Sequence, residues 1–124
     1  YKKILIEPGR SLVANSGYLA SKVVYSKVRP ENQTLILDAG MNDLMRPALY
    51  DAYHHIIPLK QKSGATELYD VVVPICESTD VLGEGREFTP IAEEEFVAIC
   101  DVGAYGSVMA SQYNLRDEAV EVFI

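Results

Sequence analysis

Short apolar runs separated by turn-forming residues make up most of this chain. Alternating or continuous apolar positions predict strands over residues 3–6, 17–28, 34–37, 53–59, 67–74, 94–101 and 119–124. Turn-forming residues between these runs predict turns at 29–33 and 60–66. Short helical turns are predicted at 11–14, around Pro47 and at 107–113. Many short strands without a long amphipathic helix favour a mainly β fold, either a barrel or a sandwich.

Polar residues gather where the predicted strands end, in segments 7–10, 46–50, 76–80 and 103–106. Such loops, held by a rigid scaffold, are where sites are usually assembled. The densest segment follows the valines at 71–73, and we expect an exposed loop there, reaching residue 85 and carrying Cys76, Glu77 and Asp80. A free cysteine is often a small buried hydrophobe, whereas several polar neighbours are hard to bury together. The local sequence leaves both interpretations of Cys76 open.

The composition argues against several classes of protein. A length of 124 residues allows one domain, and a hydrophobic content of 48% supports a globular fold. The formal net charge of −7 argues against nucleic-acid binding, which needs clustered Lys and Arg. No apolar stretch approaches the ~20 residues of a membrane helix, so we expect no membrane association and a cytoplasmic protein.

Candidate metal ligands are few. The two cysteines, Cys76 and Cys100, lack the CxxC spacing of a zinc site and are too few for a disulfide framework. The adjacent His54 and His55 would point in opposite directions along a strand, so we interpret both as structural and expect no metal. The chain begins at Tyr1 without an initiator Met, which suggests a piece of a longer protein.

Five motifs together resemble the C-terminal part of the diaminopimelate decarboxylases: EPGR at 7–10, DAGM at 38–41, MRPALY at 45–50, CESTD at 76–80 and GAYG at 103–106. These enzymes belong to the alanine racemase and ornithine decarboxylase fold group, which uses pyridoxal 5′-phosphate. The resemblance covers nearly the whole chain, with the motifs in family order. It implies a Greek-key-like C-terminal β-barrel over residues 11–124. Residues 1–10 would be the last strand and loop of an N-terminal (β/α)₈ barrel that is otherwise absent from this chain.

The resemblance also implies roles for individual residues. The cofactor contacts would be Glu7, Pro8, Gly9, Arg10 and Tyr105, with the phosphate near the backbone of Gly9 and Arg10. The substrate contacts would be Arg10, Arg46, Tyr50, Glu77 and Tyr105. Cys76 would be the proton donor, reaching with Glu77 into the neighbouring subunit's site in a homodimer. None of the lysines lies in a motif resembling the one that carries the cofactor, so that lysine is expected upstream.

The residue types agree with decarboxylation of meso-2,6-diaminopimelate to L-lysine. The end of this substrate that does not react carries a carboxylate and an ammonium, which suit two guanidiniums and one Glu. A thiol with a pKa near ~8.5 can protonate the carbanion left by CO₂. Two alternatives remain: decarboxylation of another basic amino acid or of carboxynorspermidine, and a non-catalytic β-barrel that only mediates dimerisation. For ornithine or arginine, Arg10 and Arg46 together would be unfavourable.

Overall fold

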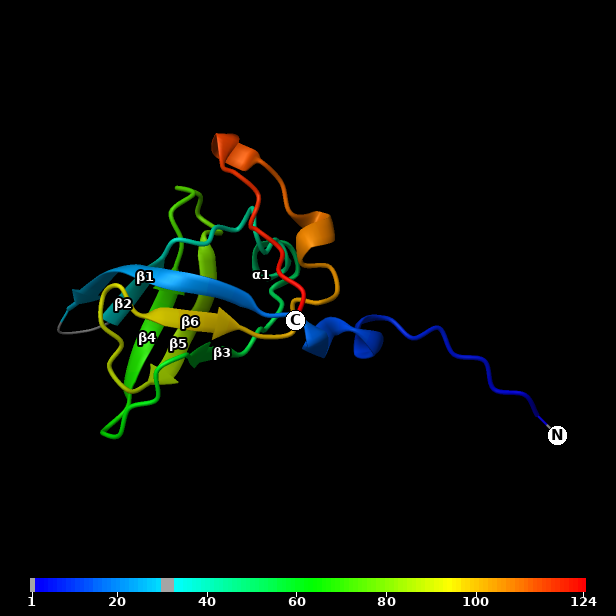
Figure 1. Cartoon of the computed structure of the whole chain (residues 1–124), viewed down its shortest axis with the longest axis horizontal. Helices are drawn as coiled ribbons and strands as arrows, with labels where there is room; N and C mark the ends of the chain where they lie inside the picture. The colour runs from blue at the N-terminus through cyan, green and yellow to red at the C-terminus, as the bar shows by residue number, and fades with distance from the viewer. Residues whose placement is uncertain (1, 30–32) are drawn as a thin grey trace.

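The computed structural model describes residues 2–29 and 33–124. It contains one sheet of six strands and a few short helical pieces (Figure 1). The strands are β1 (Leu19–Val28), β2 (Gln33–Leu37), β3 (Ile56–Pro58), β4 (Glu67–Val72), β5 (Val81–Phe88) and β6 (Phe96–Ile99). The helical pieces are α1 (Arg46–Tyr50) and the 3-10 turns η1 (Arg10–Leu12), η2 (Ala14–Ser16), η3 (Ser107–Met109) and η4 (Tyr113–Leu115).

The sheet has the strand order β3-β6-β1-β2-β4-β5. All neighbouring pairs are antiparallel except β2 and β4, which run parallel. The long β1 pairs with β6 through its first half and with β2 through its second half, with a register shift between Val23 and Tyr25. The sheet thereby bends into a nearly closed barrel, which confirms the predicted mainly β barrel.

The two edges of the sheet are joined by side chains. Arg86 on edge strand β5 places its guanidinium carbon 3.9 Å from the ring centroid of Tyr53, which lies just before edge strand β3. An arginine stacked on a tyrosine ring gains both packing area and attraction between its charge and the ring. This contact bridges the gap between the two edge strands, next to α1.

The inward faces of the strands form a continuous apolar core. Tyr69 on β4 and Phe88 on β5 contribute rings whose centroids are 6.0 Å apart. The buried core residues are Val23, Leu35, Leu37, Leu44, Ile56, Tyr69, Val71, Val73, Leu82, Phe88, Ile91, Val97 and Ile99. They come from every strand, so the apolar alternation of each strand is satisfied by the strands opposite it.

The structure corrects the predicted elements in the middle of the chain. The pattern predicts a loop up to residue 85, but β5 begins at Val81 and pairs with β4. The sequence pattern hides this strand because Gly83 and Gly85 weaken the strand signal. In the structure the two glycines lie in a strand whose pairing with β4 is irregular. The predicted helical turn at 107–113 is two separate 3-10 turns, η3 and η4. The turn predicted at 29–33 falls mainly on 30–32, which lie outside the described residues.

Both terminal strand predictions are wrong for this structure. Residues 3–6 and 119–124 are extended but form no strand, and their apolar side chains are exposed. A strand exists only where its backbone groups pair with a neighbour, and neither segment has one within the described chain. Figure 1 shows residues 2–9 projecting away from the barrel. No helix within the described residues has the length and apolar character to cross a membrane.

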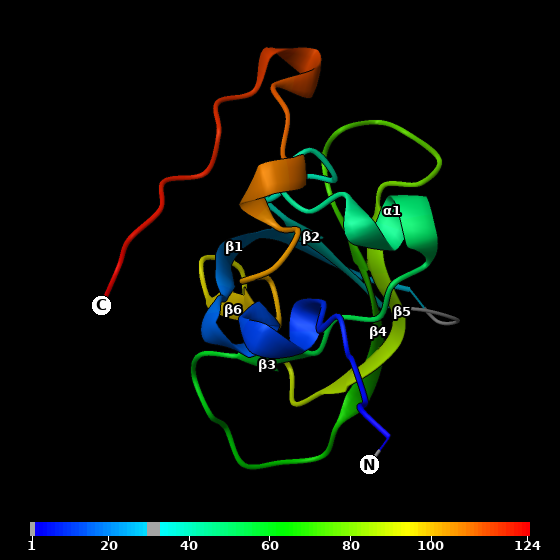
Figure 2. The same ribbon diagram turned by 90° about the vertical axis from the view of Figure 1, so that its right-hand side faces the viewer.

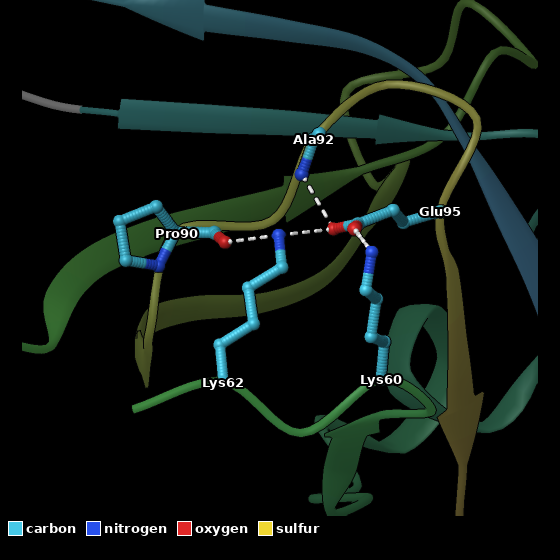
Figure 3. A network of polar contacts seen from close by, with 5 residues as sticks. All are labelled: Lys60, Lys62, Pro90, Ala92 and Glu95. Atoms are coloured by element: carbon cyan, nitrogen blue, oxygen red, sulfur yellow. Dashed lines mark hydrogen bonds and ion pairs between the residues drawn. The ribbon is translucent and has the colours of Figure 1, made fainter. Parts of the chain in front are cut away.

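A polar cluster fastens two loops at one end of the barrel (Figure 3). Glu95 accepts hydrogen bonds from Lys62 Nζ at 2.5 Å and from the Ala92 backbone N–H at 2.9 Å, and Lys60 Nζ lies 3.3 Å from its other oxygen. Lys62 also donates to the Pro90 carbonyl at 2.9 Å. The hydrogen bond from Lys62 is the main cause that lowers the pKa of Glu95 from 4.5 to about 2. We call these five residues the Glu95 cluster.

Candidate active site

The loop between β4 and β5, residues 73–80, is held by its own aspartate. The carboxylate of Asp80 is buried and accepts hydrogen bonds from the backbone N–H groups of Ile75 and Cys76, the latter at 2.9 Å. Two backbone bonds, Val73 N–H to Asp80 O and Asp80 N–H to Glu77 O, both 3.1 Å, close the loop. One buried carboxylate therefore satisfies donors that the turn would otherwise leave unpaired.

This arrangement presents Cys76 outward. Its backbone has φ of +68°, the left-handed region that costs a non-glycine residue about 1 kcal/mol or more. The residue is exposed and its thiol is free, whereas the neighbouring Ile75 is buried. Of the two interpretations of Cys76, the exposed loop position is confirmed and the buried hydrophobe is wrong. Backbone strain next to an exposed thiol is typical of a functional loop.

A later segment, residues 111–116, crosses the 73–80 loop, and we call it the strap. Tyr113 donates a hydrogen bond from its hydroxyl to Glu77 Oε1 at 2.6 Å, and this bond is the main cause that raises the pKa of Tyr113. Asn114 donates from Nδ2 to the carbonyl of Ile75 at 3.0 Å. The sequence contains no local signal for the part that Tyr113 and Asn114 play, because 36 and 39 residues separate the bonded pairs.

The segment before the loop lies close to it as well. A Cβ atom at Gly40 would overlap the side chains of Asn42 and Ile75, so only glycine allows this close approach. Thr79 Oγ1 lies 3.4 Å from Met41 Sδ. The 38–41 motif therefore packs against the base of the 73–80 loop.

Helix α1 carries the predicted substrate contacts Arg46 and Tyr50. The guanidinium carbon of Arg46 lies 5.7 Å from the Tyr50 ring centroid, which confirms that the two side chains share one face. Pro47 stands in the first turn, and left-handed Asp51 ends the helix after five residues. Arg46 Nε is buried and has no hydrogen-bond partner among the described residues, as is also true of Nε in Arg86 and Arg116.

A hollow of about 570 Å³ connects α1 with the 73–80 loop. Pro47 and Ala48 line it from α1, Ser78 and Thr79 from the loop, and Arg86 from β5. The Arg46 motif and the Cys76 motif are thus neighbours on one end of the barrel.

The predicted cofactor residues form a second group. Gly103 N–H donates to Ala14 O at 2.9 Å and Val102 N–H to Gly17 O at 3.1 Å, so the segment after Arg10 lies against the turn that carries Tyr105. A Cβ atom at Gly103 would overlap the carbonyl oxygen of Val13, which explains the glycine of this motif. Tyr105 is half exposed with φ of +59°. Glu7, Pro8, Gly9 and Arg10 are exposed on the projecting arm.

The candidate site residues are not bonded to one another within the described chain. No hydrogen bond or ion pair between described residues joins Arg10, Arg46, Cys76 and Tyr105 to one another. Residues 2–29 and 33–124 contain no group of His, Cys, Asp and Glu that could hold a metal ion. His54 is buried with Nδ1 2.8 Å from Cys100 O, which agrees with a structural role.

Comparison with known proteins identifies the family. The profile described as pyridoxal-dependent decarboxylase, C-terminal sheet domain, matches residues 11–103. The chain belongs to this family. It is 45% identical over 122 residues to diaminopimelate decarboxylase of Aquifex aeolicus, covering 98% of this chain and 29% of that protein. It is 50% identical over 113 residues to that of Methanocaldococcus jannaschii, covering 91% of this chain and 26% of that protein. The chain spans less than a third of these relatives.

Solved structures of decarboxylases have the same fold as this chain. The crystal structure of diaminopimelate decarboxylase from M. jannaschii in co-complex with L-lysine superposes with a TM-score of 0.85 at 50% identity, covering 90% of this chain and 26% of that one. A lysine/ornithine decarboxylase complexed with cadaverine, from Vibrio vulnificus, has a TM-score of 0.79 at 25% identity, covering 91% of this chain and 31% of that one. The fold is thus shared by decarboxylases that are named for different substrates.

Proposed function

We propose that this chain is the C-terminal domain of a diaminopimelate decarboxylase, which converts meso-2,6-diaminopimelate to L-lysine and CO₂. The observation that carries the proposal is the 73–80 loop, where an exposed thiol and an exposed carboxylate are adjacent on strained backbone held by buried Asp80. A module that only mediated dimerisation would need neither of these reactive groups. Identities of 45% and 50% to diaminopimelate decarboxylases support the same reading.

The residues present fit pyridoxal 5′-phosphate in part. Gly9 has open space where a side chain would stand, and Arg10 beside it is an exposed cation, so this backbone suits a phosphate. Tyr105 would lie beside the cofactor, because its turn packs against the segment that follows Arg10. None of the six lysines lies in a motif resembling the one that carries the cofactor, so the covalent lysine is proposed to come from an upstream (β/α)₈ barrel, ending with residues 1–10. When bound, the cofactor accepts the electron pair left by CO₂.

The chain's own part in the reaction is a proton transfer. Cys76 holds its proton on Sγ at the exposed side of the loop and delivers it to the carbon from which CO₂ has left. The loop's backbone bonds to Asp80 fix the direction of the thiol, and the thiol is then reprotonated from solvent. Such a positioned acid contributes about 10²- to 10⁴-fold to the rate.

The specificity follows from charges at the end of the substrate that does not react. Arg10 and Arg46 bind its carboxylate, Tyr50 adds a hydroxyl on the same face of α1, and Glu77 binds its ammonium. Ornithine and arginine lack this carboxylate, so for them two guanidiniums would repel the cationic distal group. The lysine/ornithine decarboxylase from V. vulnificus shares the fold at 25% identity, which makes a basic amino acid the second candidate substrate. Carboxynorspermidine is a third.

The exposure of the 73–80 loop is compatible with a site shared between subunits. Because Cys76 and Glu77 are exposed on an outward-facing loop, we infer a homodimer in which they enter the partner's site. The N-terminal barrel would supply the rest of the pocket. We further propose that the whole protein acts in the cytoplasm.

The test is CO₂ release by the full-length protein with pyridoxal 5′-phosphate, comparing meso-diaminopimelate, ornithine and arginine under identical conditions. The proposal predicts release from diaminopimelate and none above background from the other two. Release from ornithine or arginine in its place would retain decarboxylation and overturn the roles of Arg46 and Glu77. No release from any substrate would favour the non-catalytic alternative.

A further inference from the structure

The strap is held on the barrel by several hydrogen bonds besides the one from Tyr113. Ser111 N–H donates to Asn42 O at 2.9 Å, and Asn42 Nδ2 lies 3.3 Å from Ser111 O. Asn114 donates to Ile75 O, and Arg116 donates to Asp38 O. Asn42 is fully buried, so this end of the strap is anchored in the protein interior. The Tyr113 hydroxyl is therefore not required to keep the strap on the barrel.

The hydroxyl of Tyr113 instead determines the conformation of the Glu77 side chain. It donates to Oε1 at 2.6 Å, and Oε2 has no hydrogen bond among the residues the structure describes. Glu77 is exposed, so without Tyr113 its side chain would sample several rotamers. The bond fixes one oxygen and leaves the other as a free acceptor.

We propose that Tyr113 is a specificity-determining residue, which holds Glu77 so that Oε2 meets the ammonium at the unreactive end of the substrate. The inference rests on the function proposed above, in which Glu77 binds this ammonium. The ligand at this position is the α-amino acid group at the unreactive end of the substrate, and Glu77 binds the ammonium of that group. A side chain already ordered before binding avoids the entropy cost of being ordered by the ligand.

The test uses the full-length enzyme with Tyr113→Phe, which removes only the hydroxyl. The KM for meso-diaminopimelate should rise about three- to tenfold, the factor expected for ordering one flexible side chain, while kcat stays within about twofold. The inhibition constant of 2-aminopimelate, which keeps the distal carboxylate but lacks the distal ammonium, should not change. Tyr25→Phe, at an exposed tyrosine of β1, is the matched control.

A double-mutant cycle separates this role from a structural one. Glu77→Gln alone should raise KM, and adding Tyr113→Phe to it should have no further effect, because the hydroxyl acts through the carboxylate. Equal weakening of diaminopimelate and 2-aminopimelate, or additive effects in the cycle, would overturn the inference. If the wild-type enzyme releases CO₂ from diaminopimelate but Tyr113→Phe leaves KM unchanged, only this inference fails and the proposed function stands.

A second measurement needs no catalysis. The difference in ultraviolet absorbance between wild type and Tyr113→Phe, followed with rising pH, isolates the ionisation of Tyr113. The bond to Glu77 raises the pKa of Tyr113, so the same difference measured in the Glu77→Gln background should show a lower pKa. An identical titration in both backgrounds would show that the bond does not form in the protein.

Discussion

The 73–80 loop and the Glu95 cluster are both polar, and they lie at opposite ends of the barrel (Figures 1 and 2). In the Glu95 cluster, one carboxylate receives two ammonium groups and a backbone N–H, so the charges are matched internally. In the 73–80 loop, the buried Asp80 binds the backbone through Oδ2 only, whereas Glu77 and Cys76 are exposed, with one carboxylate oxygen and the thiol free.

The difference shows how a structural polar group can be told from a functional one. A carboxylate whose partners all come from its own fold contributes to stability and has little capacity left for a ligand. Glu95 is of this kind. Asp80 binds two backbone N–H groups through Oδ2, and its Oδ1 has no hydrogen-bond partner among the described residues, but the residue is buried and a ligand does not reach it. Glu77, three residues before Asp80, is held through one oxygen and is exposed, and a group that is ordered, accessible and not saturated is suited to binding.

The largest effect should come from removing the unused thiol. Cys76→Ala in the full-length enzyme should lower kcat about 10²- to 10⁴-fold, the usual contribution of a positioned acid, with little change in KM. The thiol acts after CO₂ leaves, so substrate binding does not depend on it. Steady-state kinetics with meso-diaminopimelate measure both constants, and Cys100→Ala is the matched control. An unchanged kcat would remove Cys76 from the proton-donor role.

A smaller effect, on stability as well as rate, should follow from Asp80→Ala. The N–H groups of Ile75 and Cys76 would lose their acceptor, which costs about 1–3 kcal/mol for buried groups. The melting temperature of the full-length protein should fall, and kcat should fall with it because the thiol is no longer directed. Asp117→Ala, at an exposed position, is the control. A normal melting temperature would show that the loop holds its shape without Asp80.

The smallest effect should come from the Glu95 cluster and should appear only in stability. The folded pKa of about 2 lies below the ordinary 4.5, so ionised Glu95 stabilises the fold above pH 4.5, and this contribution is lost as pH falls toward 2. The urea midpoint of Glu95→Gln should be below that of wild type at pH 7, and the two should converge in this window. High salt should reduce the gap. A gap independent of pH would contradict the assigned pKa.

The sequence predicted the parts of the fold that local periodicity determines. The strands corresponding to β1, β2, β4 and β6 have apolar alternation or short apolar runs, and all four are present. Residues 119–124 have similar alternation but form no strand, because pairing depends on a neighbour that periodicity cannot reveal. Strand β5 is the opposite case: its glycines weaken the sequence signal, but pairing with β4 forms the strand.

The same limit applies to the site. Arg46 and Tyr50 are four residues apart, so helix geometry alone placed them on one face. The polar run from Cys76 to Asp80 indicated an exposed loop for the same local reason. Tyr113 could not be linked to Glu77 in this way, because their contact depends on how the strap crosses the barrel. A polar aromatic residue near the end of the chain gives no local signal of such a contact.

The most direct test of the central claim, that the Cys76 loop completes the partner subunit's site, is a hybrid enzyme. Full-length Cys76→Ala and Arg46→Ala proteins, each impaired alone, are co-expressed with different tags and the mixed dimers are purified. One site of each hybrid then has both an intact Arg46 and an intact Cys76 from the other subunit. The account predicts CO₂ release from meso-diaminopimelate well above that of either parent variant. Activity no greater than the average of the two variants would mean that each subunit uses its own Cys76, and would contradict the account.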